Sequence, residues 1–158
     1  MDTPLSTSSF TIEFTSSPEW FRTIRSLLMT SSLQAGFDDR VAGQVSMAVD
    51  EALSNIHRHG YKGDCTGSII LRVDTKSTPV PQIYIQIDDE ACQVEKEVIK
   101  SRNLDEVRPG GIGVFLIKTI MDKAVWSKRE EGGMRLTMSK TFSEQKLENP
   151  KLRTKTNG

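Results

Sequence analysis

Alternating apolar and polar residues predict the strands of this chain. Residues 10–14 (FTIEF) alternate strictly, which is typical of a short strand with one buried face. Two β-rich runs, 67–74 and 82–88, predict neighbouring strands joined by a loop that contains two prolines. Residues 124–128 and 134–142 predict a closing hairpin around a turn with two glycines.

Helical periodicity predicts the other elements. The first helix spans 18–36 and ends at a glycine that can adopt the left-handed conformation. Asp38 can cap a second helix over 39–59. Segment 93–103 is moderately helical, and 114–121 is an apolar helical run. We expect the apolar face of the first helix to lie in the core; it consists of Trp20, Ile24, Leu27, Leu28 and Leu33.

The order of these elements predicts the fold class. Strands that follow one another with short loops favour a mixed, mostly antiparallel sheet with helices on one face, an α/β two-layer sandwich. The chain lacks the strict strand–helix alternation of a doubly wound parallel sheet. With 158 residues it suits one domain, over 10–142. We expect a flexible N-terminus at 1–9 and a disordered tail at 143–158, where apolar residues are scarce.

Composition disfavours several functional classes, although a local basic patch stays open. The 21 basic and 21 acidic residues leave no excess positive charge for nucleic-acid binding. No apolar run approaches the ~18 residues of a membrane span, and the N-terminus does not resemble a secretory signal. Cys65 and Cys92 are far apart and lack a zinc-ligand spacing. We therefore expect a protein of the reducing cytoplasm.

Two groups of side chains suggest chemistry. Glu51, Asn55 and His59 are four residues apart and share one helix stripe. Spacing alone favours a solvated polar face, and the alternative is a base beside a cation ligand. Asp88 ends a strong strand, where its carboxylate either faces a ligand or belongs to a turn.

A glycine cluster, Gly110-Gly111-Ile112-Gly113, opens the last predicted helix. Its backbone N–H groups could approach phosphate oxygens, although the cluster lacks the Walker pattern and also suits a flexible loop.

In series, these segments resemble the Bergerat-type, histidine-kinase-like ATPase fold. More closely, they resemble the anti-sigma-factor serine kinases of bacterial partner switching. The first segment is similar to that family's Glu-Ala-x-x-Asn-x-x-x-His-x-Tyr box through Glu51, Ala52, Asn55, His59 and Tyr61. The glycine segment is similar to its Gly-x-Gly box through Gly111 and Gly113.

The resemblance implies ATP and Mg²⁺ as cofactors. Asp88 would hold the adenine, Asn55 would ligate Mg²⁺, and Glu51 would accept the proton of a serine or threonine hydroxyl. The phosphates would lie against Gly110, Gly111 and Gly113, and Arg108 could add positive charge there. The implied partners are a sigma factor, a STAS-type anti-anti-sigma factor as phosphorylation substrate, and a second copy of the chain in a homodimer.

One segment departs from the family pattern. Glu90 and Cys92 stand where an Asp-x-Gly-x-Gly box that begins at Asp88 would have its glycines. This departure motivates an alternative, a catalytically degenerate module of the same fold that sequesters a sigma factor or regulator without ATP turnover. Another role for the same fold, such as a histidine-kinase-like domain, would need a dimerisation helix with a phospho-accepting histidine, for which the sequence offers no candidate.

Overall fold

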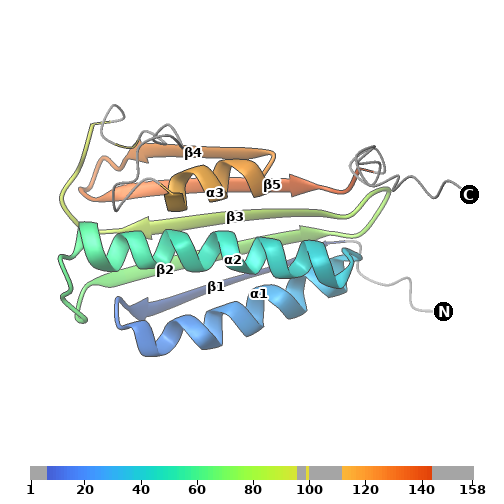
Figure 1. The fold of residues 1–158 in the computed structure, drawn as a ribbon, viewed down its shortest axis with the longest axis horizontal. Helices are drawn as coiled ribbons and strands as arrows, with labels where there is room; N and C mark the ends of the chain where they lie inside the picture. The colour runs from blue at the N-terminus through green and yellow to red at the C-terminus, as the bar shows by residue number, and fades with distance from the viewer. Residues whose placement is uncertain (1–6, 96–98, 100–111, 144–158) are drawn as a thin grey trace, which may run out of the picture.

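Five antiparallel strands form one sheet in the order β1-β2-β3-β5-β4 (Figure 1). The structure is a computed structural model, and it describes residues 7–95, 99 and 112–143. The strands are β1 (Thr7–Thr15), β2 (Ser68–Lys76), β3 (Gln82–Asp89), β4 (Lys123–Lys128) and β5 (Met134–Thr141). β1 begins earlier than the alternating pattern predicts.

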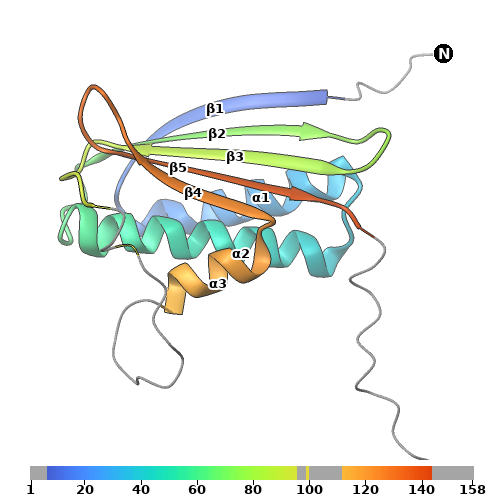
Figure 2. The same cartoon turned by 90° about the horizontal axis from the view of Figure 1, so that it is seen from above.

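The helices all cover the same face of the sheet, as Figure 2 shows. A short 3-10 turn, η1 (Pro18–Trp20), leads into α1 (Phe21–Ala35). The second helix, α2 (Asp39–Asn55), continues into a π-helical turn, η2 (Ile56–Gly60). The third, α3 (Ile112–Ile120), lies against α2. This arrangement confirms the predicted two-layer sandwich. None of the described helices is both long and apolar enough to cross a membrane.

The connection between α1 and α2 follows the predicted capping residues. Gly36 ends α1 with φ 104°, and its N–H donates to the Leu33 carbonyl at 3.0 Å. The Asp38 carboxylate accepts a hydrogen bond of 2.7 Å from the Val41 N–H and so caps α2. These two signals place the start of α2, and α2 carries the candidate site residues.

The core lies between the helices and one face of the sheet. Alternate residues of β3 face the helices, and Ile83, Ile85 and Ile87 are all buried there. Two residues expected in the core are instead 45% and 40% exposed, namely Trp20 and Leu33. Trp20 belongs to the tighter turn before α1, and Leu33 falls on the solvent flank between the buried Ser32 and Ala35.

The helix predicted over 93–103 falls largely outside the described residues. Its first three positions, 93–95, have no regular secondary structure. The predicted termini at 1–9 and 143–158 are also largely outside, with only 7–9 and Ser143 described.

Candidate functional site

The C-terminal half of α2 meets the start of α3 at two of the predicted site residues. Glu51 and Asn55 are one turn apart on α2, and Gly113 lies directly against them. A Cβ atom on Gly113 would be 2.7 Å from Glu51 Oε2 and 3.3 Å from Asn55 Nδ2. Neither side chain has a hydrogen bond or ion pair within the part of the chain that the structure describes.

The donor set at this place suits a largely hydrated Mg²⁺. Mg²⁺ prefers oxygen ligands and usually keeps several waters beside one or two protein groups and substrate phosphates. Asn55 offers an amide oxygen and Glu51 a carboxylate, and the lack of a side chain on Gly113 lets the Glu51 carboxylate lie against the start of α3. Among the described residues, no group of three or more His, Cys, Asp or Glu could hold a metal alone.

Three other predicted phosphate-binding residues, Arg108, Gly110 and Gly111, lie outside the described residues.

A π turn contains His59. The Tyr61 N–H donates to the Ile56 carbonyl at 2.8 Å, a bond that spans five residues rather than four. His59 lies within this π turn and is exposed. The predicted stripe of Glu51, Asn55 and His59 therefore ends in a π turn rather than in regular α-helix.

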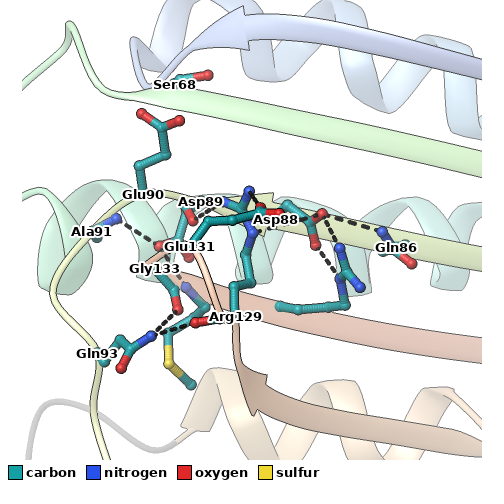
Figure 3. Close-up of polar contacts among 12 residues, drawn as sticks. Ser68, Gln86, Asp88, Asp89, Glu90, Ala91, Gln93, Arg129, Glu131 and Gly133 are labelled. Atoms are coloured by element: carbon teal, nitrogen blue, oxygen red, sulfur yellow. Dashed lines mark hydrogen bonds and ion pairs between the residues drawn. The ribbon is translucent and has the colours of Figure 1, made fainter.

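Asp88 lies on the face of the sheet that carries no helix. Its two carboxylate oxygens accept hydrogen bonds of 2.7 Å from Arg135 Nε and Nη2, and Gln86 Nε2 donates to it at 3.2 Å (Figure 3). Only 7% of its side chain is exposed. The structure therefore separates Asp88 from Glu51, Asn55 and Gly113, with which the sequence analysis had grouped it.

The next residue, Asp89, is on the helix face and is buried. Its Oδ1 accepts hydrogen bonds from the Ala91 N–H at 2.9 Å and the Met134 N–H at 3.3 Å. Its Oδ2 accepts none from any described residue. Burial raises the pKa of Asp89, although these N–H groups and Arg129 favour the charged form. Asp89 was not among the predicted site residues. The period of two in β3 indicates it, because Ile83, Ile85 and Ile87 share its face.

The backbone after β3 does not need the glycines of the family pattern. Glu90, Ala91 and Cys92 all avoid positive φ. The Glu90 side chain extends toward Ser68 and away from Asp89 in Figure 3. Counted from Asp89, the box Asp-x-Gly-x-Gly has Ala91 and Gln93 at its two glycine positions.

Tyr61 connects this segment to the neighbouring elements. Its hydroxyl donates to the Ser68 carbonyl at 2.6 Å and accepts the Glu90 N–H at 2.8 Å. Gly67 allows the ring to lie there, since a Cβ on Gly67 would be 2.4 Å from it. Burial raises the pKa of Tyr61, so the hydroxyl stays protonated and can act as the donor.

The sequence matches the histidine kinase-like ATPase domain family over residues 14–140. The chain belongs to this family. Among similar proteins, the serine-protein kinase RsbW of Staphylococcus aureus is 30% identical to this ATPase domain over 144 residues, covering 84% of the chain and 86% of the relative. RsbW of Listeria innocua is 25% identical over 146 residues, covering 87% and 90%.

A solved structure shows the same fold. It contains the RsbU and RsbW domains of a Mycobacterium tuberculosis protein and superposes with a TM-score of 0.59 at 17% identity. The match covers 84% of this chain and 31% of that one. The family and fold expected from the three sequence segments are thus confirmed.

Proposed function

We propose that this ATPase domain binds Mg-ATP and transfers the γ-phosphoryl group to a serine or threonine of a protein partner. The observation that carries this proposal is the contact of Gly113 with Glu51 and Asn55. Neither of these two polar side chains has a hydrogen bond or ion pair to a described residue. Similarity to the RsbW serine-protein kinases supports the reaction class.

We propose that Asp89, rather than Asp88, binds the adenine of the nucleotide. Asp89 is on the helix face, and its Oδ2 can accept a hydrogen bond from the exocyclic amino group of adenine. Asp88 is unsuited because Arg135 occupies both of its oxygens.

At the other end of the nucleotide, Asn55 would hold Mg²⁺, which when bound neutralises charge on the phosphates. Glu51 would accept the proton of the partner's hydroxyl while its oxygen forms a bond to the γ-phosphorus. The bond from that phosphorus to the bridging oxygen breaks, and ADP leaves with the electron pair. Gly113 lets the substrate approach Glu51, and Gly110, Gly111 and Arg108 remain our candidates for the phosphates. Positioning and charge stabilisation supply most of such catalysis.

The partners we propose are a sigma factor, sequestered by the domain, and a STAS-type anti-anti-sigma factor, phosphorylated by it in the bacterial cytoplasm. A homodimer through the sheet is part of this proposal. The basis is the similarity to RsbW over most of both chains.

A second candidate is a binding module of the same fold without ATP turnover. Ala91 and Gln93 at the glycine positions after β3 favour it. The negative φ of Ala91 and the outward direction of Glu90 weigh against it, because neither residue obstructs the Asp89 carboxylate.

A thermal-shift titration with Mg-ATP separates the two candidates. Saturation at about 100 times Kd stabilises a protein by about 2.7 kcal/mol, so we expect Tm to rise by roughly 5 °C or more. No rise in a folded protein would support the binding module.

The kinase reaction is then tested with Glu51→Gln and a purified STAS-domain antagonist. We expect labelled phosphate transfer to fall at least about 100-fold. The matched control is Asp50→Asn, since Asp50 is the adjacent carboxylate but contacts Arg25 at 3.3 Å and not Gly113. An unchanged rate in Glu51→Gln would remove Glu51 as the base.

A further inference from the structure

Two segments that are distant in sequence meet at the end of β3. One comprises the last residue of β3 and the four that follow it, residues 89–93, and is called the post-β3 segment here. The other is the turn of the β4–β5 hairpin, residues 129–133. Gly133 lies so close to β3 that a Cβ atom there would be 1.8 Å from the Asp89 carbonyl oxygen. The hairpin turn therefore packs backbone against backbone on the post-β3 segment.

Side chains from both segments join them. Arg129 Nη1 donates to the Asp89 carbonyl at 2.6 Å. In the opposite direction, Gln93 Nε2 donates to the Arg129 carbonyl at 2.7 Å and to the Gly133 carbonyl at 3.2 Å (Figure 3). The last residue pair of the β3–β5 ladder is Asp88 with Arg135. The carbonyl groups that accept these hydrogen bonds lie beyond that pair. They extend the connection between the strands past the end of the sheet.

The Arg129 side chain is largely buried although it belongs to a hairpin turn. Only 12% of its side chain is exposed. Carboxylates surround it, with Glu131 at 3.2 Å from Nη2 and Asp88 at 4.0 Å from Nε. Burial of a cation is costly unless it is paired. These carboxylates offset part of that cost, while Arg129 Nε is buried without a hydrogen bond to any described residue.

The Asp89 carboxylate depends on both segments at once. One N–H that it accepts, from Ala91, belongs to the post-β3 segment, and the other, from Met134, follows the hairpin turn. The orientation of the carboxylate is therefore set by how these two segments lie relative to one another, and Arg129 and Gln93 connect them.

We propose that Arg129 and Gln93 are positioning residues that orient the Asp89 carboxylate for recognition of the adenine amino group. The inference rests on the proposed nucleotide function. It also accounts for Gln93 at the second glycine position counted from Asp89: a side-chain amide there makes two hydrogen bonds that a glycine cannot make.

The test compares the affinities of Mg-ATP and Mg-ITP for the full chain by calorimetry. ITP has a carbonyl where ATP has the amino group, so the affinity ratio reports on the contact with Asp89. We expect the wild type to prefer ATP by about tenfold or more, since a site built for an amino group rejects an analogue that lacks it. In Arg129→Met and in Gln93→Ala the ratio should fall at least about threefold, while ITP affinity changes less than about twofold.

Arg135→Met is the matched control. It removes a guanidinium from Asp88, the adjacent aspartate on the other face, and should keep the wild-type ratio. An unchanged ratio in both test variants would overturn the positioning role while leaving the nucleotide function standing. Absence of any ATP binding by the wild type would overturn both. If Arg129→Met does not fold, Gln93→Ala decides, because Gln93 is exposed and its replacement leaves the core intact.

Discussion

Gly60 and Ala91 are in contact where η2 meets the post-β3 segment: a Cβ atom on Gly60 would be 3.0 Å from the Ala91 Cβ. The Ala91 methyl group thus lies close to the space that a side chain at position 60 would need. The two positions can hold one methyl group between them but not two in the observed geometry.

This contact predicts a compensating pair of substitutions. Gly60→Ala should destabilise the protein by about 1–2 kcal/mol through overpacking, and adding Ala91→Gly should recover most of that loss. Urea denaturation of the wild type, both single variants and the double variant measures the coupling. Gly43→Ala is the control, because a Cβ there meets nothing within 4 Å, and it should be neutral or stabilising. Additive effects of the two substitutions would contradict the proposed packing.

Gly113→Ala should impair phosphoryl transfer more than stability. The added methyl group would displace the Glu51 carboxylate, which can move at little cost because it is the end of a flexible side chain. We expect a change in unfolding free energy within about 1 kcal/mol and a rate at least tenfold lower, since small displacements of reacting groups are costly. A phosphorylation assay beside a urea titration measures both. Full activity would show that Glu51 does not need its observed position.

The two adjacent aspartates should respond oppositely to neutralisation. Asp89→Asn keeps an oxygen for the Ala91 and Met134 N–H groups and removes a buried charge, so we expect a gain on the order of 1 kcal/mol near pH 7.5. Asp88→Asn removes the partner of Arg135 and should destabilise.

The gain in Asp89→Asn should depend on pH. Burial raises the pKa of Asp89 in the folded state. At a pH between the unfolded and the folded pKa, the native protein therefore binds a proton that the unfolded chain has released. The resulting stability is fully present below the unfolded pKa and is lost as pH rises through the folded pKa. The advantage of the variant should therefore shrink as pH falls toward about 4, which urea titrations at several pH values will show. An advantage that is constant with pH would contradict this cause.

Tyr61→Phe should destabilise the junction between η2, β2 and β3 by about 1–3 kcal/mol, because it leaves the Ser68 carbonyl and the Glu90 N–H without a protein partner. Tyr84→Phe is a matched control, since the Tyr84 hydroxyl has no hydrogen bond to any described residue and the side chain is 39% exposed. Thermal unfolding compares them, and equal Tm values for the two variants would count against the role of Tyr61.

Local patterns were enough for much of the architecture. The alternation in 10–14, 67–74 and 82–88 predicted three strands, and the spacing of Glu51 and Asn55 placed both on one helix face. Such features depend on neighbours a few residues apart, so they can be recognised without the fold.

The features that the sequence analysis missed depend on longer distances or on small shifts in phase. The π turn over Ile56–Gly60 was not predicted, because the helical periodicity there continues without a break. The bond from Arg129 to Asp89 joins residues 40 positions apart, and nothing in either local pattern predicts it. Asp88 was predicted to hold the adenine, but consecutive side chains of β3 lie on opposite faces of the sheet, and Asp89 is the one on the helix face.

The central position of β3 has a consequence for local unfolding. β1 and β4 are the edges of the sheet, and either can open without removing a hydrogen-bonding neighbour from β3, whose partners are β2 and β5. Local openings usually begin at such edges, so the amides of β3 should exchange with solvent only in the larger openings. Asp89 is the last residue of β3, the strand whose amides should exchange most slowly. A partner that opens either edge strand would therefore leave Asp89 in place.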